Sequence, residues 1–194
     1  SILPGNFAIS ARETYGKTSN GMICSSRELG LGDDHNGIIV IDDEKVNVGS
    51  EALGVLGAND PIIDIAVNPD RGYAMSVRGA ARELAMSLGV AFKDVNGRAL
   101  VASLEKKKKR GKVTPVLISD KSGADRIFLR SLTNVNPLSA TPRWMARRLT
   151  QSGMRPISVA VDITNYVMLE IGQALLAFDA AKIAGTLRVQ RAGK

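Results

Sequence analysis

The chain has 194 residues, of which 44% are hydrophobic and 23% are charged, and this composition is typical of a folded globular protein. Its net charge of +7 is unevenly placed: residues 1–92 carry 7 basic and 12 acidic side chains, whereas residues 93–194 carry 19 basic and 7 acidic ones. A basic second half is typical of proteins that bind a polyanion, nucleic acid above all, although a solvated surface gives the same pattern.

A single cysteine, Cys24, and a single histidine, His35, exclude several classes of site. They cannot build a disulfide framework, a Cys/His zinc site or most histidine-assisted nucleophilic sites, and a cytoplasmic location fits best. The chain has no apolar run long enough to span a membrane and begins at Ser1 without a leader pattern. We therefore expect no membrane partner, and we expect a piece of a longer protein.

The first half predicts short strands followed by one clear helix. Residues 38–41 and 62–67 are apolar runs flanked by turn residues, which is typical of buried strands. A helix is predicted over residues 73–88, with Gly89 as its left-handed cap. Its apolar stripe at helical spacing consists of Val77, Ala81, Leu84 and Leu88.

Residues 93–112 interrupt this periodicity and predict a loop or linker. They include six cations within seven positions, and the repulsion among them opposes a regular element. These cations are Lys106, Lys107, Lys108, Lys109, Arg110 and Lys112. A contact with nucleic acid and a solvated loop both remain open for this run.

The remainder predicts strands at 116–118 and 127–132, followed by two helices. Thr141 and Pro142 are expected to open a helix that ends at Gly153, with Trp144 as a core anchor. Arg143 and Arg147 form a basic pair four residues apart on it. A further helix is predicted over 159–171. Strands followed by helices, without regular strand–helix–strand units, predict an α+β fold with more than one domain.

Three long stretches carry a resemblance to a known family. They are GMICSSRELGLGDDHNG at 21–37, NPDRGYAMSVRGAAREL at 68–84, and PRWMARRL at 142–149, which continues through RPI, VDITNYVMLEIGQ and AFD to 179. In order and spacing they resemble the β subunit of bacterial phenylalanine–tRNA ligase. This resemblance implies a partial OB-type barrel at 1–48, a return segment of the N-terminal domain at 49–92, a Lys-rich linker at 93–112, and the first part of an editing domain at 113–194.

The resemblance also implies a function. In the family, the α subunit activates phenylalanine with ATP and Mg²⁺ and transfers it to tRNA(Phe), within an assembly of two α and two β subunits. No catalytic residue for ligation and no metal ligand is expected in this chain, which also contains no phosphate-binding loop of the G-x-x-x-x-G-K type. We therefore expect the chain alone to be inactive as a ligase.

Editing, the hydrolysis of tyrosine wrongly attached to tRNA(Phe), is the family's chemistry nearest to these residues. A pocket shaped for phenylalanine rejects an added hydroxyl poorly, so a second site must check for it. Arg155 and Asn165 match family residues in or beside that editing pocket, although a salt bridge of Arg155 with Asp162 or Glu170, or a surface hydrogen bond of Asn165, would explain them equally well. Leu176 stands where the family has a main editing histidine, and leucine can neither hydrogen-bond nor titrate.

Three functions remain open from the sequence. The chain could belong to a tRNA ligase β subunit, it could be a basic RNA-binding module without enzymatic activity, or it could be a stand-alone hydrolase of misacylated tRNA. The leucine at position 176 makes the hydrolase the least favoured of the three. The Lys106–Lys112 run, Arg143 and Arg147 are the expected tRNA contacts in the first two cases.

Overall fold

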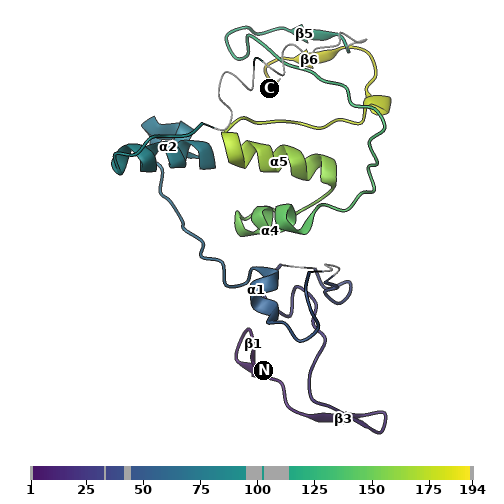
Figure 1. Ribbon diagram of the computed structural model, residues 1–194. Coiled ribbons are helices and arrows are strands. Elements are labelled where there is room, and N and C mark those ends of the chain that lie inside the picture. The colour runs from purple at the N-terminus through teal and green to yellow at the C-terminus, as the bar shows by residue number, and fades with distance from the viewer. Residues whose placement is uncertain (1, 33, 42–44, 95–101, 103–113, 193–194) are drawn as a thin grey trace. The chain divides into compact units, whose positions relative to one another are not determined.

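The computed structural model describes residues 2–32, 34–41, 45–94, 102 and 114–192 (Figure 1). The chain is divided into two compact units. Unit 1 consists of Ser1–Ile65 and Arg143–Arg155, and unit 2 consists of Ala66–Pro142 and Pro156–Lys194. Each unit is thus assembled from two stretches that are distant in the sequence. The domain boundaries that the family resemblance implies remain a prediction.

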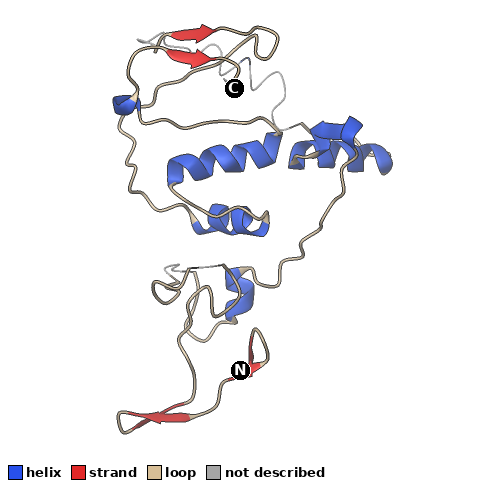
Figure 2. Cartoon of the chain, turned by 180° about the vertical axis from the view of Figure 1, so that it is seen from behind, coloured by secondary structure: helices blue, strands red, loops and turns tan. Residues whose placement is uncertain are grey.

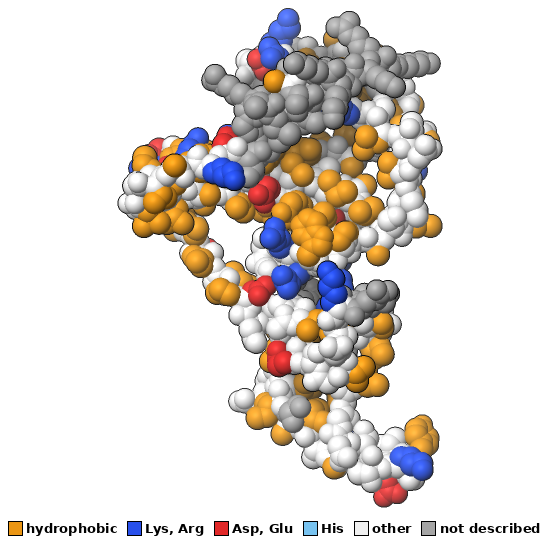
Figure 3. Space-filling model, in the orientation of Figure 1, with side chains coloured by type: hydrophobic (Ala, Val, Ile, Leu, Met, Phe, Trp, Pro, Cys, Tyr) orange, Lys and Arg blue, Asp and Glu red, His pale blue; other side chains and the backbone are white. Residues whose placement is uncertain are grey.

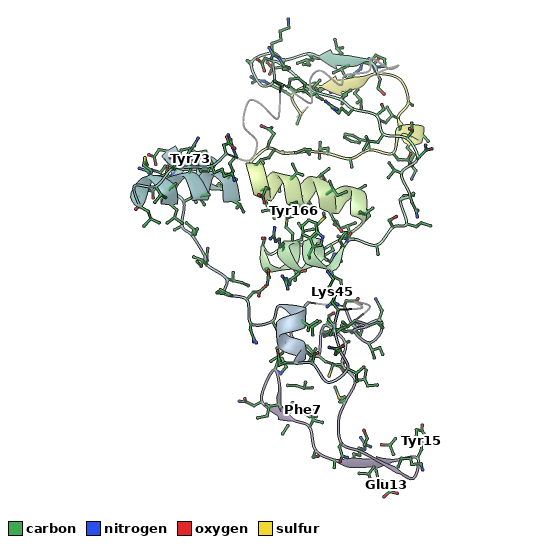
Figure 4. All side chains as sticks on the ribbon, viewed as in Figure 1. Phe7, Glu13, Tyr15, Lys45, Tyr73 and Tyr166 are labelled. Carbon is green, nitrogen blue, oxygen red and sulfur yellow. The ribbon has the colours of Figure 1, made fainter. Side chains whose placement is uncertain are left out.

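Unit 1 begins with two small antiparallel hairpins. β1 (Ile2–Leu3) pairs with β2 (Phe7–Ala8), and β3 (Arg12–Thr14) pairs with β4 (Lys17–Ser19). At the end of the second hairpin, Tyr15 and Gly16 have φ angles of 53° and 69°, and this pair of left-handed residues matches the twist of a two-residue hairpin turn (Figure 4). The described residues form no closed barrel, so the barrel segment remains a prediction.

The helices of unit 1 are short and well capped. In α1 (Ala52–Leu56), the Glu51 carboxylate accepts hydrogen bonds from the first backbone N–H groups. α4 (Arg143–Gln151) ends as the sequence predicts, because Gly153 has a φ of 79° and the next N–H bonds back to the carbonyl of Leu149 at 2.9 Å. Met145 and Leu149 form the buried face of α4.

Unit 2 contains the longer helices and a parallel pair of strands. A 3-10 helix, η1 (Pro69–Ala74), leads into α2 (Val77–Ser87), and α5 (Val159–Ile171) packs against α2. β5 (Val116–Ile118) pairs in parallel with β6 (Leu187–Val189), which follows a second 3-10 helix, η2 (Ala180–Lys182) (Figure 2). The described elements are therefore mixed α and β, as expected.

The packing of α2 depends on small residues. Ser76 caps the helix by accepting a hydrogen bond from the N–H of Gly79 at 3.1 Å. Gly79 lies directly against the backbone of η1, because a Cβ there would approach the carbonyl oxygen of Tyr73 to 1.9 Å. Gly172, the C-terminal cap of α5, lies against Ser76, which brings the end of α5 to the start of α2.

The structure corrects several predicted elements. The predicted strands at 38–41, 62–67 and 127–132 are absent from the described chain. In the second of these, Ile62, Ile63 and Ile65 are 67%, 80% and 58% exposed, so the apolar run has neither a ladder partner nor a covering layer. Apolar runs alone do not make strands, since each strand also needs a neighbour to bond with.

The predicted helices are confirmed, with two corrections in detail. The helix predicted over 73–88 begins at Val77, because η1 occupies the preceding residues. Its predicted apolar stripe faces solvent at all four positions, since Ala81 is exposed and Val77, Leu84 and Leu88 are each more than half exposed. Gly79 and Ala85 are buried instead. The helix α5 has the predicted bounds.

Candidate functional site

The basic face of α4 is the first part of the candidate site. Three of its nine residues are arginines, Arg143, Arg147 and Arg148, and none is acidic. Because an α-helix has 3.6 residues per turn, these arginines share one side, which lies opposite the buried Met145 and Leu149. Figure 3 shows Lys and Arg side chains gathered about this helix.

Arg147 is largely engaged within unit 1. Its Nε lies 3.5 Å from a carboxylate oxygen of Asp60, and its side chain covers Gly57, where an added Cβ would meet Arg147 Cδ at 2.3 Å. Gln151, one turn later, donates hydrogen bonds to Asp60 at 3.0 Å and to the carbonyl of Gly57 at 3.3 Å. These contacts fix α4 to the end of α1, so Arg147 is a structural residue first, and its predicted tRNA contact remains a prediction.

Trp144 is not the core anchor that the sequence predicts, because it is 49% exposed. Arg148 lies over its ring, with the guanidinium carbon 5.7 Å from the ring centroid, a cation–π arrangement. Arg143 is exposed and forms no ion pair with a described residue. An exposed indole among cations is a feature that the sequence does not reveal, since the spacing of Trp144 fits a core position equally well.

The start of α5 is held by a buried carboxylate. Asp162 is completely buried, and it accepts hydrogen bonds from the N–H of Ile157 at 2.8 Å and from the hydroxyl of Thr141. The sequence predicts that the Thr141 hydroxyl caps α4, but this hydroxyl donates to Asp162 instead. A buried carboxylate requires such partners, so this pair of bonds ties residues 141 and 157 to the first turn of α5.

Asn165 lies one turn further along α5 and is half-buried. Its side-chain amide forms no hydrogen bond with the described residues, unlike Thr164 beside it, whose hydroxyl donates to the carbonyl of Val161 at 2.7 Å. An amide that is partly shielded from water and carries both donor and acceptor groups is suited to bind a ligand or orient a water. Its role in editing remains a prediction.

The other predicted editing positions are exposed. Arg155 follows α4 in unit 1 and forms no ion pair with the described residues, while Asp162, one suggested partner, is bonded to Thr141 and Ile157. Leu176 is 78% exposed, in the irregular segment between α5 and η2 of unit 2. The residues from Lys106 to Lys112 lie outside the described part of the chain.

One carboxylate of unit 2 is electrostatically perturbed. Asp120, just after β5, accepts hydrogen bonds from the hydroxyl and the N–H of Ser122 at 2.5 and 2.9 Å, and from Arg191, just after β6. The hydrogen bond from the Ser122 hydroxyl contributes most, and the bond from Arg191 second most, to a pKa of Asp120 that is lowered to about 2. This network joins the ends of the β5–β6 ladder and does not include the predicted editing residues, so we assign it a structural role.

A further cluster lies on α2. The Glu83 carboxylate accepts hydrogen bonds from the Tyr73 hydroxyl, at 2.6 Å, and from Arg71, while Arg82 lies over the Tyr73 ring at 4.3 Å. The bond from Tyr73 lowers the pKa of Glu83 and raises that of Tyr73. Tyr73 is labelled in Figure 4. The cluster ties η1 to α2.

Two kinds of feature are absent from the described residues. Within them, no three His, Cys, Asp or Glu side chains come together as a metal site would require. No helix built from them is long and apolar enough to cross a membrane.

Comparison with known proteins identifies relatives over nearly the whole chain. The chain is 49% identical over 191 residues to the phenylalanine–tRNA ligase beta subunits of Streptomyces avermitilis and of Thermobifida fusca, covering 98% of this chain in each case. It is 42% identical over 214 residues to that of Bifidobacterium longum, covering 100% of this chain. The chain spans only about 22–24% of the length of these relatives.

A family model covers the last part of the chain. Residues 123–194, which include α4, α5, β6 and all the predicted editing positions, match the B3/4 domain. The family resemblance predicted from the sequence motifs is thereby confirmed. Nearly the whole chain is homologous to one stretch of the phenylalanine–tRNA ligase beta subunit, with a B3/4 domain at its C-terminal end.

Proposed function

We propose that this chain acts as a stretch of a phenylalanine–tRNA ligase β subunit that helps to bind tRNA(Phe) and to assemble with an α subunit. The observation that carries the proposal is the identity of 42–49% with such subunits over 97–100% of the chain. The basic side of α4 supports a role beside tRNA, since arginines are suited to bind phosphates.

The same proposal assigns the ligation chemistry to the whole enzyme. That enzyme would be a cytoplasmic assembly of two α and two β subunits that uses ATP and Mg²⁺ to attach phenylalanine to tRNA(Phe). We assign no metal ligand to this chain, because the family resemblance places none in this stretch. By itself this chain would have no ligase activity.

A chimera tests the proposal. In the Streptomyces avermitilis β subunit, the 191-residue homologous stretch is replaced by this chain, and the product is combined with that organism's α subunit. We expect the chimera to assemble and to attach phenylalanine to tRNA(Phe) at a rate near that of the parent. A chimera that folds and assembles but does not aminoacylate would contradict the proposal.

We also propose that editing by this domain is weak. Arg155 and Asn165 are retained as candidates to bind the substrate ester or a water, with Asn165 half-buried and unbonded to described residues. Leu176 supplies no proton donor or acceptor at the position where the family has histidine, so an orienting or acid–base contribution is missing there. We expect slow hydrolysis of Tyr-tRNA(Phe) by the parent enzyme.

A second function is favoured by one observation, the cluster of arginines on α4 without any acidic residue in that helix. A basic module that binds tRNA or other RNA without an enzymatic role would need only this charge. Its affinity would fall steeply with salt and would be unchanged by Asn165→Ala. Aminoacylation by the chimera separates the two functions, because a simple RNA-binding module would not restore it.

A further inference from the structure

Trp144 occupies the middle of the basic side of α4. Each residue of an α-helix is rotated by about 100° about the axis from the one before it. Four side chains of α4 therefore lie within an arc of about 140°, in the order Arg143, Arg147, Trp144 and Arg148 around the helix. The buried side chains Met145 and Leu149 lie on the opposite side of the helix. The indole is therefore flanked by arginines on both edges of the exposed face, and half of its surface is open to solvent.

The chemistry of this face is that of a nucleotide contact. An exposed indole ring gives a flat surface on which any base can stack, and nearby guanidinium groups can bind the adjoining phosphates. The ring already accepts a planar cation, since the guanidinium of Arg148 lies 5.7 Å from its centroid. Asp60 neutralises part of the charge of Arg147, and α4 itself contains no acidic residue.

We propose that Trp144, Arg143 and Arg148 form a contact for an unpaired nucleotide of RNA. The base stacks on the indole ring, and the two arginines bind the phosphates on either side of that nucleotide. This contact deepens the proposed function and rests on it, because the RNA that the whole enzyme presents to this face is tRNA. An acidic protein surface would complement the same charge, but it would make no use of an exposed aromatic plane.

The chain itself provides the probe, since Trp144 is its only tryptophan. The full chain is titrated with a short single-stranded oligoadenylate, and with the same oligonucleotide paired to oligouridylate, while tryptophan fluorescence is recorded. We expect the single strand to quench the fluorescence and the duplex to leave it unchanged, because paired bases are not available for stacking. Binding of the single strand without quenching would overturn the proposal.

Variants separate stacking from charge. Trp144→Leu should weaken binding of a fluorescein-labelled oligoadenylate roughly tenfold, whereas Trp144→Phe, which keeps an aromatic plane, should retain most of the affinity. Arg143→Gln should weaken binding and reduce its salt dependence, with Arg126→Gln, an exposed arginine of unit 2, as the matched control. Tyr15→Leu, at an exposed aromatic residue of the β3–β4 turn, should have no effect.

Two outcomes would contradict the nucleotide contact. Equal affinities of wild type, Trp144→Leu and Trp144→Phe for the single strand would show that charge alone binds RNA, and would leave the proposed tRNA role intact. Quenching by polyglutamate equal to that by oligoadenylate would assign this face to an acidic protein instead. Failure of the proposed function would be recognised separately, as loss of aminoacylation in the chimera.

Discussion

Among the described glycines of unit 2, Gly79 is the one whose surroundings leave no room for a side chain. A Cβ at this residue would lie 1.9 Å from the carbonyl oxygen of Tyr73, a backbone atom that cannot move without displacing η1. Although alanine favours helices more than glycine does, we expect Gly79→Ala to lower the free energy of unfolding by about 2 kcal/mol. Chemical denaturation measures this change.

Gly72 provides the matched control, because a Cβ there meets nothing within 4 Å and its backbone is not left-handed. Gly72→Ala should change the free energy of unfolding by less than about 0.5 kcal/mol. Similar losses for the two variants would show that η1 does not press on α2 as the structure has it.

Asp120 predicts a specific dependence of stability on pH. Hydrogen bonds from Ser122 and Arg191 hold the pKa of this carboxyl at about 2 in the folded chain, below its ordinary value of 3.8. The stabilisation is therefore complete above pH of about 4 and is lost as the pH falls toward about 2, because the unfolded chain takes up the proton first. Chemical denaturation between about pH 4 and pH 2 should show a fall in the free energy of unfolding for wild type and a smaller fall for Asp120→Asn.

An exposed carboxyl of the same turn region supplies the comparison. Asp125→Asn should keep the wild-type dependence, since Ser122 and Arg191 bond to Asp120 and to each other, not to Asp125, and the side chain of Asp125 is exposed. If Asp120→Asn lost as much stability as wild type between about pH 4 and pH 2, the assigned network would be wrong.

At the scale of elements, the start of α5 depends on the bond between Thr141 and Asp162. Removing either partner leaves a buried polar group unsatisfied, so Thr141→Val and Asp162→Ala should each lower the free energy of unfolding by about 1–3 kcal/mol. The double variant should cost less than the sum, because the bond can be lost only once. Thr150→Val, at an exposed position of α4, is the control.

Additivity of the two losses would contradict this bond as the link between residue 141 and α5. The same variants also report on the candidate site, since Asn165 lies one turn beyond Asp162 on α5. Loss of the link should disturb the position of Asn165 as well as stability.

The sequence predicts helices better than strands in this chain, for a physical reason. The bounds of α5 and the glycine that ends α4 follow from local periodicity and local backbone geometry, both of which the sequence contains. The run at 62–67 has the composition of a strand, but a ladder needs a partner, and the described chain provides none. The β3–β4 hairpin depends on its Tyr15-Gly16 turn, for which tyrosine is an unusual signal.

The buried side of α2 could not be predicted from hydrophobicity either. The helix presents its small residues Gly79 and Ala85 inward, because η1 and α5 approach it closely, and leaves Leu84 exposed. The predicted core position of Trp144 is wrong for the same reason. An apolar side chain indicates a preference for burial, but it does not indicate which surface is available to cover it. The sequence suggests Asp162 only as an ion-pair partner of Arg155, although its position in the first turn of α5 is a signal for its bonding role.

At the scale of the whole molecule, sequence motifs predict more than composition does. The change of charge from acidic to basic halves suggests a polyanion partner but fits many proteins. The ordered motifs predict one family, and the relatives confirm it across 97–100% of the chain. The editing residues stay predictions: Arg155 belongs to unit 1 and Asn165 to unit 2, and Leu176 departs from the family pattern.

The most direct test of the proposed weak editing is the rate at which the chimeric enzyme hydrolyses Tyr-tRNA(Phe), with and without Leu176→His. The chimera that keeps Leu176 should hydrolyse Tyr-tRNA(Phe) slowly. Leu176→His should raise the rate by roughly 100-fold, the lower end of what a general acid or base contributes. Leu175→His, next to it and also exposed, is the control and should give no gain. Rapid hydrolysis by the chimera that keeps Leu176, or no increase in rate with Leu176→His, would contradict the editing role assigned to position 176.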